Sequence, residues 1–210
     1  EGKKYFVKTF GCQMNEHDSE KIAGMFELDG MTKAIIEDSA DIMFINTCTI
    51  RENADDRLYG TLGQLKKWKD EGVDRKLLVG GCAAQKDKEL VRERAPWVDV
   101  VIGTHNLTNI INLLNQSEDW GPITEIIDEI EDLPTDAPSI RESEHSAWLT
   151  IQIGCNNSCT FCIVPSVRGP EISRRPSDII NEAQELVESG IKEITLLGQN
   201  VNSYGRDLKI

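Results

Sequence analysis

The sequence predicts an α/β protein built from two units, a parallel five-stranded sheet with flanking helices and then the first part of a (β/α) barrel. Two observations lead to this prediction. Apolar, strand-like runs alternate with helical patterns through the first half of the chain, and a separate strand–loop–helix–strand pattern follows an acidic stretch. With 210 residues, of which 39% are hydrophobic and 28% charged, the composition is that of an ordinary soluble protein able to bury at least one core.

The first unit alternates between strand and helix. The expected strands are Lys3–Phe10, Met31–Ile36, Asp41–Asn46, Lys76–Val79 and Val98–Ile102. The expected helices are one that starts near Asn15 or Asp18 and buries Ile22, Met25 and Phe26, followed by Glu52–Lys69, Lys86–Arg94 and Leu107–Leu114. Strands and helices in alternation imply right-handed crossovers and a parallel sheet, for which we expect the flavodoxin-like strand order 2-1-3-4-5.

Three cysteines follow three of these strands. Cys12, Cys48 and Cys82 each come just after the carboxyl end of an expected strand, and in the order above those three strands are neighbours. Ligands of open parallel sheets bind at this edge, near the switch in strand order. We therefore expect the three cysteines to meet there, although each one alone would also be an ordinary buried core cysteine.

The net charge of −13 is concentrated in one segment. Between Ser117 and Ala147 the chain has ten acidic residues and one basic residue, so the rest of the chain is only weakly acidic. This pattern is typical of a solvated linker. It predicts a sheet domain at 1–116, a linker at 117–146 and the start of a barrel at 147–210.

The second unit has the repeat pattern of a (β/α) barrel. Its expected elements are a strand Trp148–Ile153, a loop Gly154–Arg175, a helix Ser177–Ser189 with Ser177 as N-cap and Gly190 as its stop, and a strand Glu193–Leu197. So short a stretch cannot close a barrel. We therefore expect the chain to be part of a longer protein.

Cys155, Cys159 and Cys162 form a C-x3-C-x2-C motif directly after the first of these strands. Three thiolates on one loop can hold three irons of a [4Fe–4S] cluster and leave the fourth iron open to a small molecule. Structural zinc would need a fourth Cys or His, and disulfides are rare in a reducing compartment. The spacing favours the open cluster, with zinc and disulfides as alternatives.

This motif, with Phe161 before the last cysteine, resembles the radical S-adenosylmethionine (SAM) superfamily. The resemblance implies that the open iron binds SAM and that reductive cleavage of SAM yields a 5′-deoxyadenosyl radical. It also implies SAM contacts near Phe161 and at Gly198, Gln199 and Asn200. Many members of the superfamily have a Gly-Gly-Glu-type motif where this chain has Gly-Gln-Asn, so the side-chain roles of the last two residues depart from the common pattern.

Further motifs resemble the methylthiotransferases. They are Gly11-Cys12-Gln13-Met14-Asn15, Asn46-Thr47-Cys48, Gly80-Gly81-Cys82 and the run from Val164 to Arg174. The resemblance covers nearly the whole chain apart from the acidic segment. It is strongest to the branch that modifies N6-isopentenyladenosine beside the tRNA anticodon, and weaker to the branches that modify a ribosomal-protein aspartate or threonylcarbamoyladenosine in tRNA.

The resemblance implies two [4Fe–4S] clusters, one on each cysteine set, and two uses of SAM. One SAM gives a methyl group to sulfur held at the first set, and the other forms the radical at the second. It further implies a tRNA anticodon loop as partner and an electron donor such as flavodoxin or ferredoxin. We expect a cytoplasmic monomer that is inactive as this 210-residue chain alone. A two-cluster electron-transfer protein is the alternative of another class, although it would normally have four cysteines per cluster.

Three arginines, Arg168, Arg174 and Arg175, form the most basic cluster near the second cysteine set. They have two interpretations, contact with tRNA phosphates or pairing with nearby acids such as Glu171. Sequence spacing does not separate these.

Overall fold

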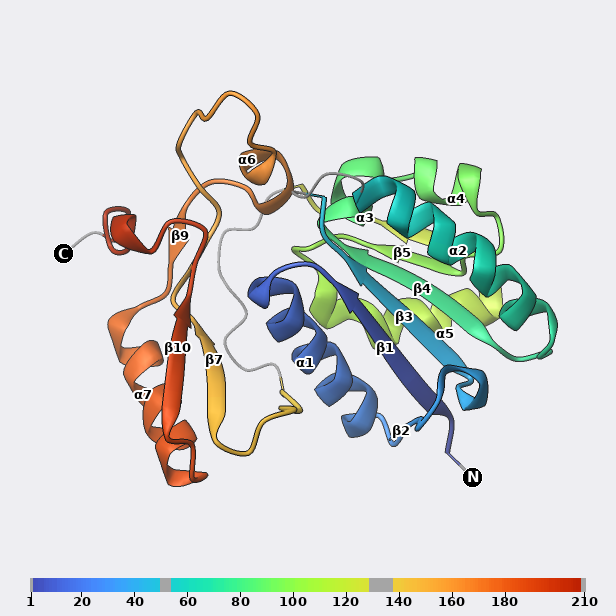
Figure 1. Ribbon diagram of the computed structural model, residues 1–210, viewed down its shortest axis with the longest axis horizontal. Helices are drawn as coiled ribbons and strands as arrows, with labels where there is room; N and C mark the ends of the chain where they lie inside the picture. The colour runs from blue at the N-terminus through green and yellow to red at the C-terminus, as the bar shows by residue number, and fades with distance from the viewer. Residues whose placement is uncertain (1, 50–53, 129–137, 209–210) are drawn as a thin grey trace.

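The computed structural model describes residues 2–49, 54–128 and 138–208, which form two units lying side by side (Figure 1). The strands of the first unit are β1 (Lys4–Phe10), β2 (Thr32–Lys33), β3 (Ile42–Thr47), β4 (Lys76–Gly81), β5 (Val100–Ile102) and β6 (Ile123–Glu125). Its helices are α1 (Gln13–Leu28), α2 (Ala54–Asp70), α3 (Cys82–Asp87), α4 (Leu90–Arg94) and α5 (Ile110–Trp120), with 3-10 turns η1 (Glu37–Ser39) and η2 (Leu107–Asn109).

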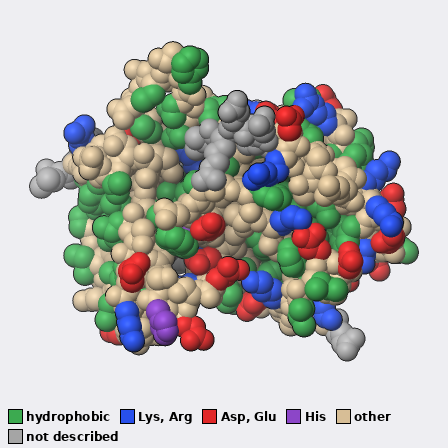
Figure 2. Space-filling view, in the orientation of Figure 1, with side chains coloured by type: hydrophobic (Ala, Val, Ile, Leu, Met, Phe, Trp, Pro, Cys, Tyr) green, Lys and Arg blue, Asp and Glu red, His purple; other side chains and the backbone are tan. Residues whose placement is uncertain are grey.

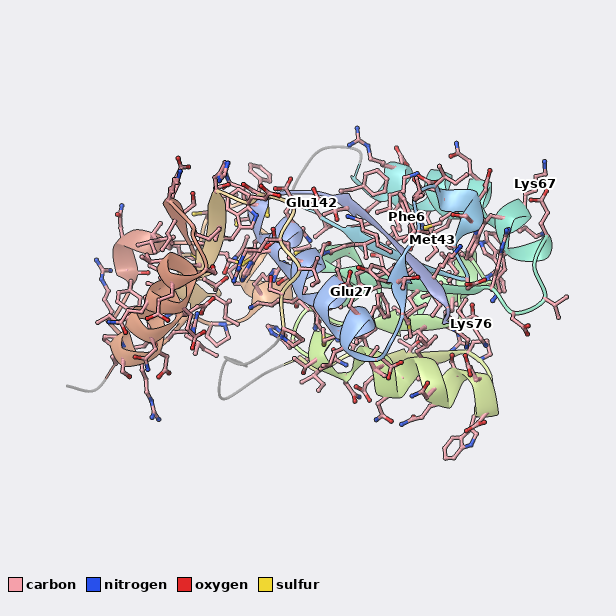
Figure 3. All side chains as sticks on the ribbon, turned by 90° about the horizontal axis from the view of Figure 1, so that it is seen from below. Phe6, Glu27, Met43, Lys67, Lys76 and Glu142 are labelled. Carbon is pink, nitrogen blue, oxygen red and sulfur yellow. The ribbon has the colours of Figure 1, made fainter. Side chains whose placement is uncertain are left out.

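The described strands of this unit pair in parallel in the order β2-β1-β3-β4-β5-β6. Helices cover both faces of the sheet (Figure 1 and Figure 3). Both faces need covering because the side chains of each strand alternate between them, as β3 illustrates. Met43 and Ile45 pack with the core under α2, α3 and α4, whereas Ile42 and Phe44 pack with the core under α1 and α5. The predicted parallel α/β class is confirmed.

The second unit consists of β7 (Ser146–Thr150), β8 (Gln152–Ile153), α6 (Val164–Arg168), β9 (Ile172–Ser173), α7 (Pro176–Glu188), β10 (Glu193–Leu197) and η3 (Val201–Ser203). Strands β7 and β10 pair in parallel, and β8 pairs with β9 antiparallel. Helix α7 closes a small core in which Leu149 and Leu186 are buried. The strand–helix–strand pattern predicted for the start of a barrel is present.

The sheet differs from the prediction in its number of strands. A sixth strand, β6, pairs with β5 inside the segment predicted to be a linker, and the predicted boundary at 116 falls within α5. Strand β6 has only three residues, Ile-Thr-Glu, all partly exposed, and this sequence has no apolar run that would predict a strand. The expected strand Met31–Ile36 is reduced to β2, and Ile35 and Ile36 are exposed.

Helix boundaries also differ. The predicted helix Lys86–Arg94 is two helices, α3 and α4, separated at Lys88, which has a φ of 50°. Ser177 is not an N-cap, because α7 begins one residue earlier at Pro176. Proline suits the first helical position, where no amide hydrogen is needed. The predicted start of the helix Glu52–Lys69 lies outside the described residues, and α2 is described from Ala54.

Helix packing and a hydrogen bond join the two units. Helix α6 packs against α3, and β7 packs against α1. Thr150 on β7 donates a hydrogen bond to the Met14 sulfur on α1 at 3.7 Å. In Figure 1, α6 lies over the carboxyl edge of the six-stranded sheet. In the described part of the chain, we find no helix with the length and apolar character needed to cross a membrane.

Candidate functional site

Cys12, Cys48 and Cys82, the first cysteine set, lie at the carboxyl ends of three neighbouring strands. Cys12 precedes α1 and follows β1, Cys48 comes directly after β3, and Cys82 is the first residue of α3 after β4. Strand β3 lies between the other two, with Phe10 paired to Thr47 and Thr47 to Gly81. The predicted meeting of these three positions at one edge of the sheet agrees with the observed strand order.

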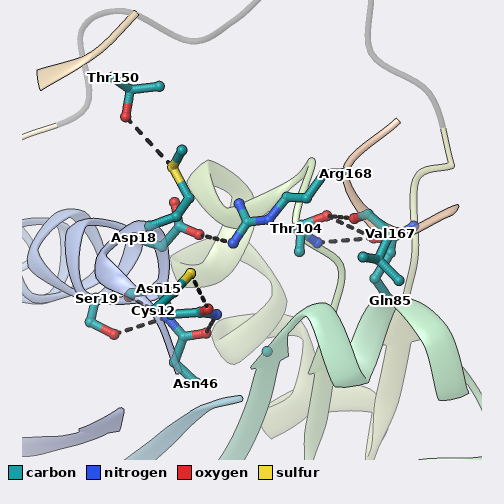
Figure 4. A network of polar contacts seen from close by, with 12 residues as sticks. Cys12, Asn15, Asp18, Ser19, Asn46, Gln85, Thr104, Thr150, Val167 and Arg168 are labelled. Carbon is teal, nitrogen blue, oxygen red and sulfur yellow. Dashed lines mark hydrogen bonds and ion pairs between the residues drawn. The ribbon is translucent and has the colours of Figure 1, made fainter. Parts of the chain in front are cut away.

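An amide network adjoins Cys12 (Figure 4). The Asn15 side chain donates to Asn46 Oδ1 at 3.0 Å, and the Asn46 side chain donates to the Asn15 carbonyl at 2.8 Å and to Ser19 Oγ at 2.9 Å. Both asparagines are fully buried. Because each amide is satisfied by the other element, the network fixes the start of α1 against the end of β3.

Glycines allow the strand ends to approach one another. Gly81 has a φ of 88°, and a Cβ there would lie 2.3 Å from Asn46 Oδ1 and 2.5 Å from the Thr47 carbonyl oxygen. A Cβ at Gly11 would lie 2.9 Å from Cys48 Cβ. The sequence needs glycine beside Cys12 and Cys82 because a larger residue would push the strand ends apart.

The surroundings of Cys12 favour its thiolate. A hydrogen bond from Cys48 lowers the pKa of Cys12 to about 5, against the effect of burial, and the backbone amides of Asn15 and Met14 and the charge of Arg168 act in the same direction. As a thiol, Cys12 donates to Asn15 Oδ1 at 3.4 Å. A thiolate is the form of cysteine that ligates iron.

The second cysteine set, Cys155, Cys159 and Cys162, lies on the loop between β8 and α6. The base of the loop is tightly held. Gly154 has a φ of 75°, and a Cβ there would lie 1.9 Å from the Pro170 carbonyl oxygen. The Cys155 amide donates to the Gly169 carbonyl at 3.1 Å. The tip of the loop is open, because Cys159 and Cys162 are exposed.

Of the four residues expected near SAM, Phe161 lies on this loop, and Gly198, Gln199 and Asn200 follow β10. The Phe161 side chain is almost fully exposed. Gln199 Oε1 accepts a hydrogen bond from the Gly154 amide at 2.6 Å, and Asn200 Nδ2 donates to Glu171 Oε1 at 3.2 Å. A Cβ at Gly198 would meet only ordinary contacts with Gln152. Gln199 and Asn200 thus support the loop and its neighbour, and their contact with SAM stays a prediction.

Two of the three clustered arginines are buried and paired with acids. Arg168 is 5% exposed and donates to Asp18 Oδ2 at 2.8 Å. Arg174 is 8% exposed and donates to Glu182 Oε2 at 2.5 Å and to the Thr150 carbonyl at 2.8 Å. Their acids are thus Asp18 and Glu182 rather than the predicted Glu171. Only Arg175 is exposed.

The donor chemistry of both sets fits an iron–sulfur cluster. All six cysteines lie in the described residues, and none is in a disulfide bond. Within residues 2–49, 54–128 and 138–208, no three His, Cys, Asp or Glu side chains converge as they would around one metal ion. A [4Fe–4S] cluster makes a different demand, because its thiolates bind separate irons of one larger group. The first set places three thiols at one edge of the sheet, and the second places three on one loop. Each set can therefore supply the three thiolates that such a cluster needs.

Two family models match the chain. Residues 4–103 match the model described as uncharacterized protein family UPF0004, and residues 149–210 match the radical SAM superfamily. Proteins named tRNA-2-methylthio-N(6)-dimethylallyladenosine synthase are similar in sequence to nearly all of this chain. The one from Corynebacterium efficiens is 54% identical over 96% of this chain and 38% of its own length, and the one from Tropheryma whipplei is 55% identical over 96% and 43%.

The chain belongs to the family of these synthases. The predicted methylthiotransferase resemblance is therefore confirmed, and the chain spans 38% to 43% of the length of these two relatives. A solved structure shares the fold. The radical SAM methyltransferase TsrM from Kitasatospora setae superimposes with a TM-score of 0.59 at 9% identity, over 96% of this chain and 49% of TsrM.

Sequence reasoning named Asn15, Asn46 and Asp18 in motifs or at a helix start, but it did not predict their contacts around the first cysteine set. Asn46 carried a faint signal, because it is a polar residue at the end of an apolar strand. No sequence signal linked Asp18 to its partner Arg168, which lies 150 positions away in the chain.

Proposed function

We propose that the protein to which this chain belongs is a methylthiotransferase that modifies N6-isopentenyladenosine beside the tRNA anticodon. The observation that carries the proposal is the pair of three-cysteine sets, one in each unit, in a chain more than half identical to synthases of that name. The overall change replaces a hydrogen on the adenine ring by a methylthio group.

One of the two matched families supports a cofactor assignment. The match of residues 149–210 to the radical SAM superfamily supports SAM and an iron–sulfur cluster at the second cysteine set. We further propose a second [4Fe–4S] cluster at the first set, Cys12, Cys48 and Cys82. When bound, the two groups supply radical generation from SAM and a site for the sulfur that is transferred.

The residues of this chain hold and orient these groups. The Asn15–Asn46 network fixes the strand ends that carry Cys12 and Cys48, and the Gly154–Pro170 contact fixes the base of the loop that carries Cys155. The burial of Cys48 and Cys82 limits access by water at the first set, whereas the exposed Cys159 and Cys162 leave room for SAM at the second. Gly198, Gln199, Asn200 and Phe161 are the proposed SAM neighbours in this unit.

The proposal of tRNA as a partner rests on the names of the relatives rather than on the surface charge of this chain. On the face shown in Figure 2, lysine and arginine side chains are interspersed with aspartate and glutamate, and they do not gather into a basic surface over the described residues. We propose that tRNA binding draws on parts of the protein beyond this chain. A flavodoxin or ferredoxin as electron donor, a monomeric state and a cytoplasmic location complete the proposal.

Anaerobic assay of the full-length protein tests this function. The protein would be supplied with SAM, dithionite and tRNA that carries N6-isopentenyladenosine, and the digested nucleosides analysed by mass spectrometry. We expect the methylthio nucleoside from the parent protein and from the control variant Thr160→Ala, whose exposed residue lies in the second loop between two cysteines. We expect none from Cys159→Ala or Cys48→Ala.

Other products would point to the alternatives. Methylthiolation of threonylcarbamoyladenosine, or of an aspartate when ribosomal protein is supplied, would assign the chain to another branch of methylthiotransferases. Loaded clusters that exchange electrons but neither cleave SAM nor transfer sulfur would indicate an electron-transfer protein.

A further inference from the structure

Arg168 is a buried cation that reaches from the second unit into the first. Its guanidinium donates to Asp18 on α1, with 5% and 11% of the two side chains exposed. Burial lowers the pKa of Arg168, but the negative charges of Asp18 and of the Cys82 thiolate raise it, and the charge of Arg168 in turn lowers the pKa of Cys12. Figure 4 shows Arg168 extending from α6 toward Asp18, above the Cys12 and Asn15 side chains. A cation from the second unit therefore lies among residues of the first cysteine set.

The backbone around Arg168 is fixed from both sides. Helix α6 begins two residues after Cys162, so the helix that carries Arg168 is tied to the second cysteine set. The neighbouring Val167 carbonyl accepts a hydrogen bond from Thr104 Oγ1 of the first unit at 2.7 Å, and Gln85 of α3 accepts one from the Thr104 amide at 2.9 Å. Arg168 is thus held in place by contacts that do not depend on its own ion pair.

Arg174 is the matched comparison. It is also buried and also paired with an acid, but both Glu182 and Arg174 belong to the second unit. The guanidinium of Arg174 donates to Glu182 and to the Thr150 carbonyl. Of these two ion pairs, Arg168–Asp18 joins α6 to α1, the helix that follows Cys12, whereas Arg174–Glu182 joins two residues of the second unit.

We propose that Arg168 is a positioning residue through which the radical SAM unit holds the first cysteine set and raises the reduction potential of the cluster bound there. The inference rests on the proposed function, which places a cluster on Cys12, Cys48 and Cys82. Net charge and hydrogen bonds to sulfur set the potential of such clusters. A guanidinium beside a cysteine ligand favours the reduced form, which carries one more negative charge, whereas Asp18 opposes it.

The test is a redox titration of the full-length protein in which Cys155, Cys159 and Cys162 are replaced by alanine, so that only the first set can bind a cluster. Iron and sulfide analysis establishes loading, and EPR at controlled potentials gives the midpoint. The variants are Arg168→Gln, Asp18→Asn and, as the matched control, Arg174→Gln. Arg168→Lys serves as the conservative variant that keeps the charge.

We expect opposite shifts. Arg168→Gln makes the potential more negative, by on the order of tenfold in the redox equilibrium or about 59 mV for one electron, and Arg168→Lys restores part of the shift. Asp18→Asn makes it more positive, and it keeps the test decisive if Arg168→Gln does not fold. Arg174→Gln leaves the potential unchanged.

Loaded protein whose midpoint does not move in Arg168→Gln and Asp18→Asn, or moves in the same direction in both, overturns this inference alone. A first set that binds no iron in the parent protein overturns the proposed function, and the inference with it.

Discussion

Cys48 and Cys82 are 4% and 1% exposed in a packed layer where strands end and helices begin, whereas Cys159 and Cys162 lie on the exposed tip of a loop. The first set is assembled from three distant parts of the sequence by the strand order β1-β3-β4. The second is assembled locally, within eight residues whose base is held by Gly154. The comparison shows that sites of the same composition can be fixed by tertiary packing or by a single loop.

The largest expected difference is in the reactivity of the thiols. In the reduced protein without metal, we expect Cys159 and Cys162 to be alkylated by iodoacetamide on the order of a hundredfold faster than Cys48 and Cys82, because core positions react only after costly opening. Mass spectrometry of labelled peptides at several times measures the rates. In denaturant the rates should become equal. Similar rates in the native protein would contradict the buried placement of the first set.

For the second set, we expect the substitution with the largest effect on stability to be one at the base of its loop. Gly154→Ala forces a Cβ to within 1.9 Å of the Pro170 carbonyl oxygen at a φ of 75°. We expect a loss of roughly 2–4 kcal/mol in the free energy of unfolding from overpacking and backbone strain. The matched control is Gly190→Ala, which has a φ of 95° and no atom within 4 Å, and should cost about 1–2 kcal/mol. Denaturant unfolding measures both, and equal losses would contradict the account.

For the first set, we expect the substitution with the largest effect on stability to be one in the Asn15–Asn46 network. Asn46→Ala removes the side-chain donor to the buried Asn15 carbonyl, and it leaves the Asn15 amide with the longer of its two hydrogen bonds, to the Thr47 carbonyl at 3.5 Å. We expect it to cost about 1–3 kcal/mol and to lower iron loading at the first set only. Asn156→Ala is the control, because this exposed residue accepts one hydrogen bond, from the Glu171 amide. Equal iron loss from both cysteine sets in Asn46→Ala would show that the network does not act locally.

The smallest expected effect concerns pH at the junction of the units. Burial lowers the pKa of His105 below its ordinary value of 6.5, with the charge of Arg168 acting in the same direction. The unfolded chain therefore takes up the proton more readily, and stability is lost as pH falls through 6.5 and below. We expect His105→Gln to reduce the slope of unfolding free energy against pH in that range. An unchanged slope would contradict a buried neutral histidine.

The sequence was sufficient for the parts of the site that have local signatures. Apolar runs that end at Gly-Cys or Thr-Cys marked the ends of β1, β3 and β4, and the alternation of strands and helices predicted the parallel order that brings them together. The loop of the second set is recognisable from the spacing of three cysteines alone.

The parts that could not be predicted depend on distant contacts. Strand β6 is three partly exposed residues that become a strand only by pairing with β5. Arg168 resembled its neighbours Arg174 and Arg175 in sequence, yet its burial is decided by Asp18 on another element. No local pattern distinguishes a buried ion pair from a basic surface cluster, because the difference lies in which helix packs over it.

The most direct test of two independent centres is the iron and sulfide content of the reconstituted full-length protein and of two triple variants, with alanine at positions 12, 48 and 82 or at 155, 159 and 162. The account predicts about eight irons in the parent and about four in each triple variant. About four irons in the parent, lost only from the second triple variant, would contradict a cluster on the first set, and one zinc without sulfide would contradict both.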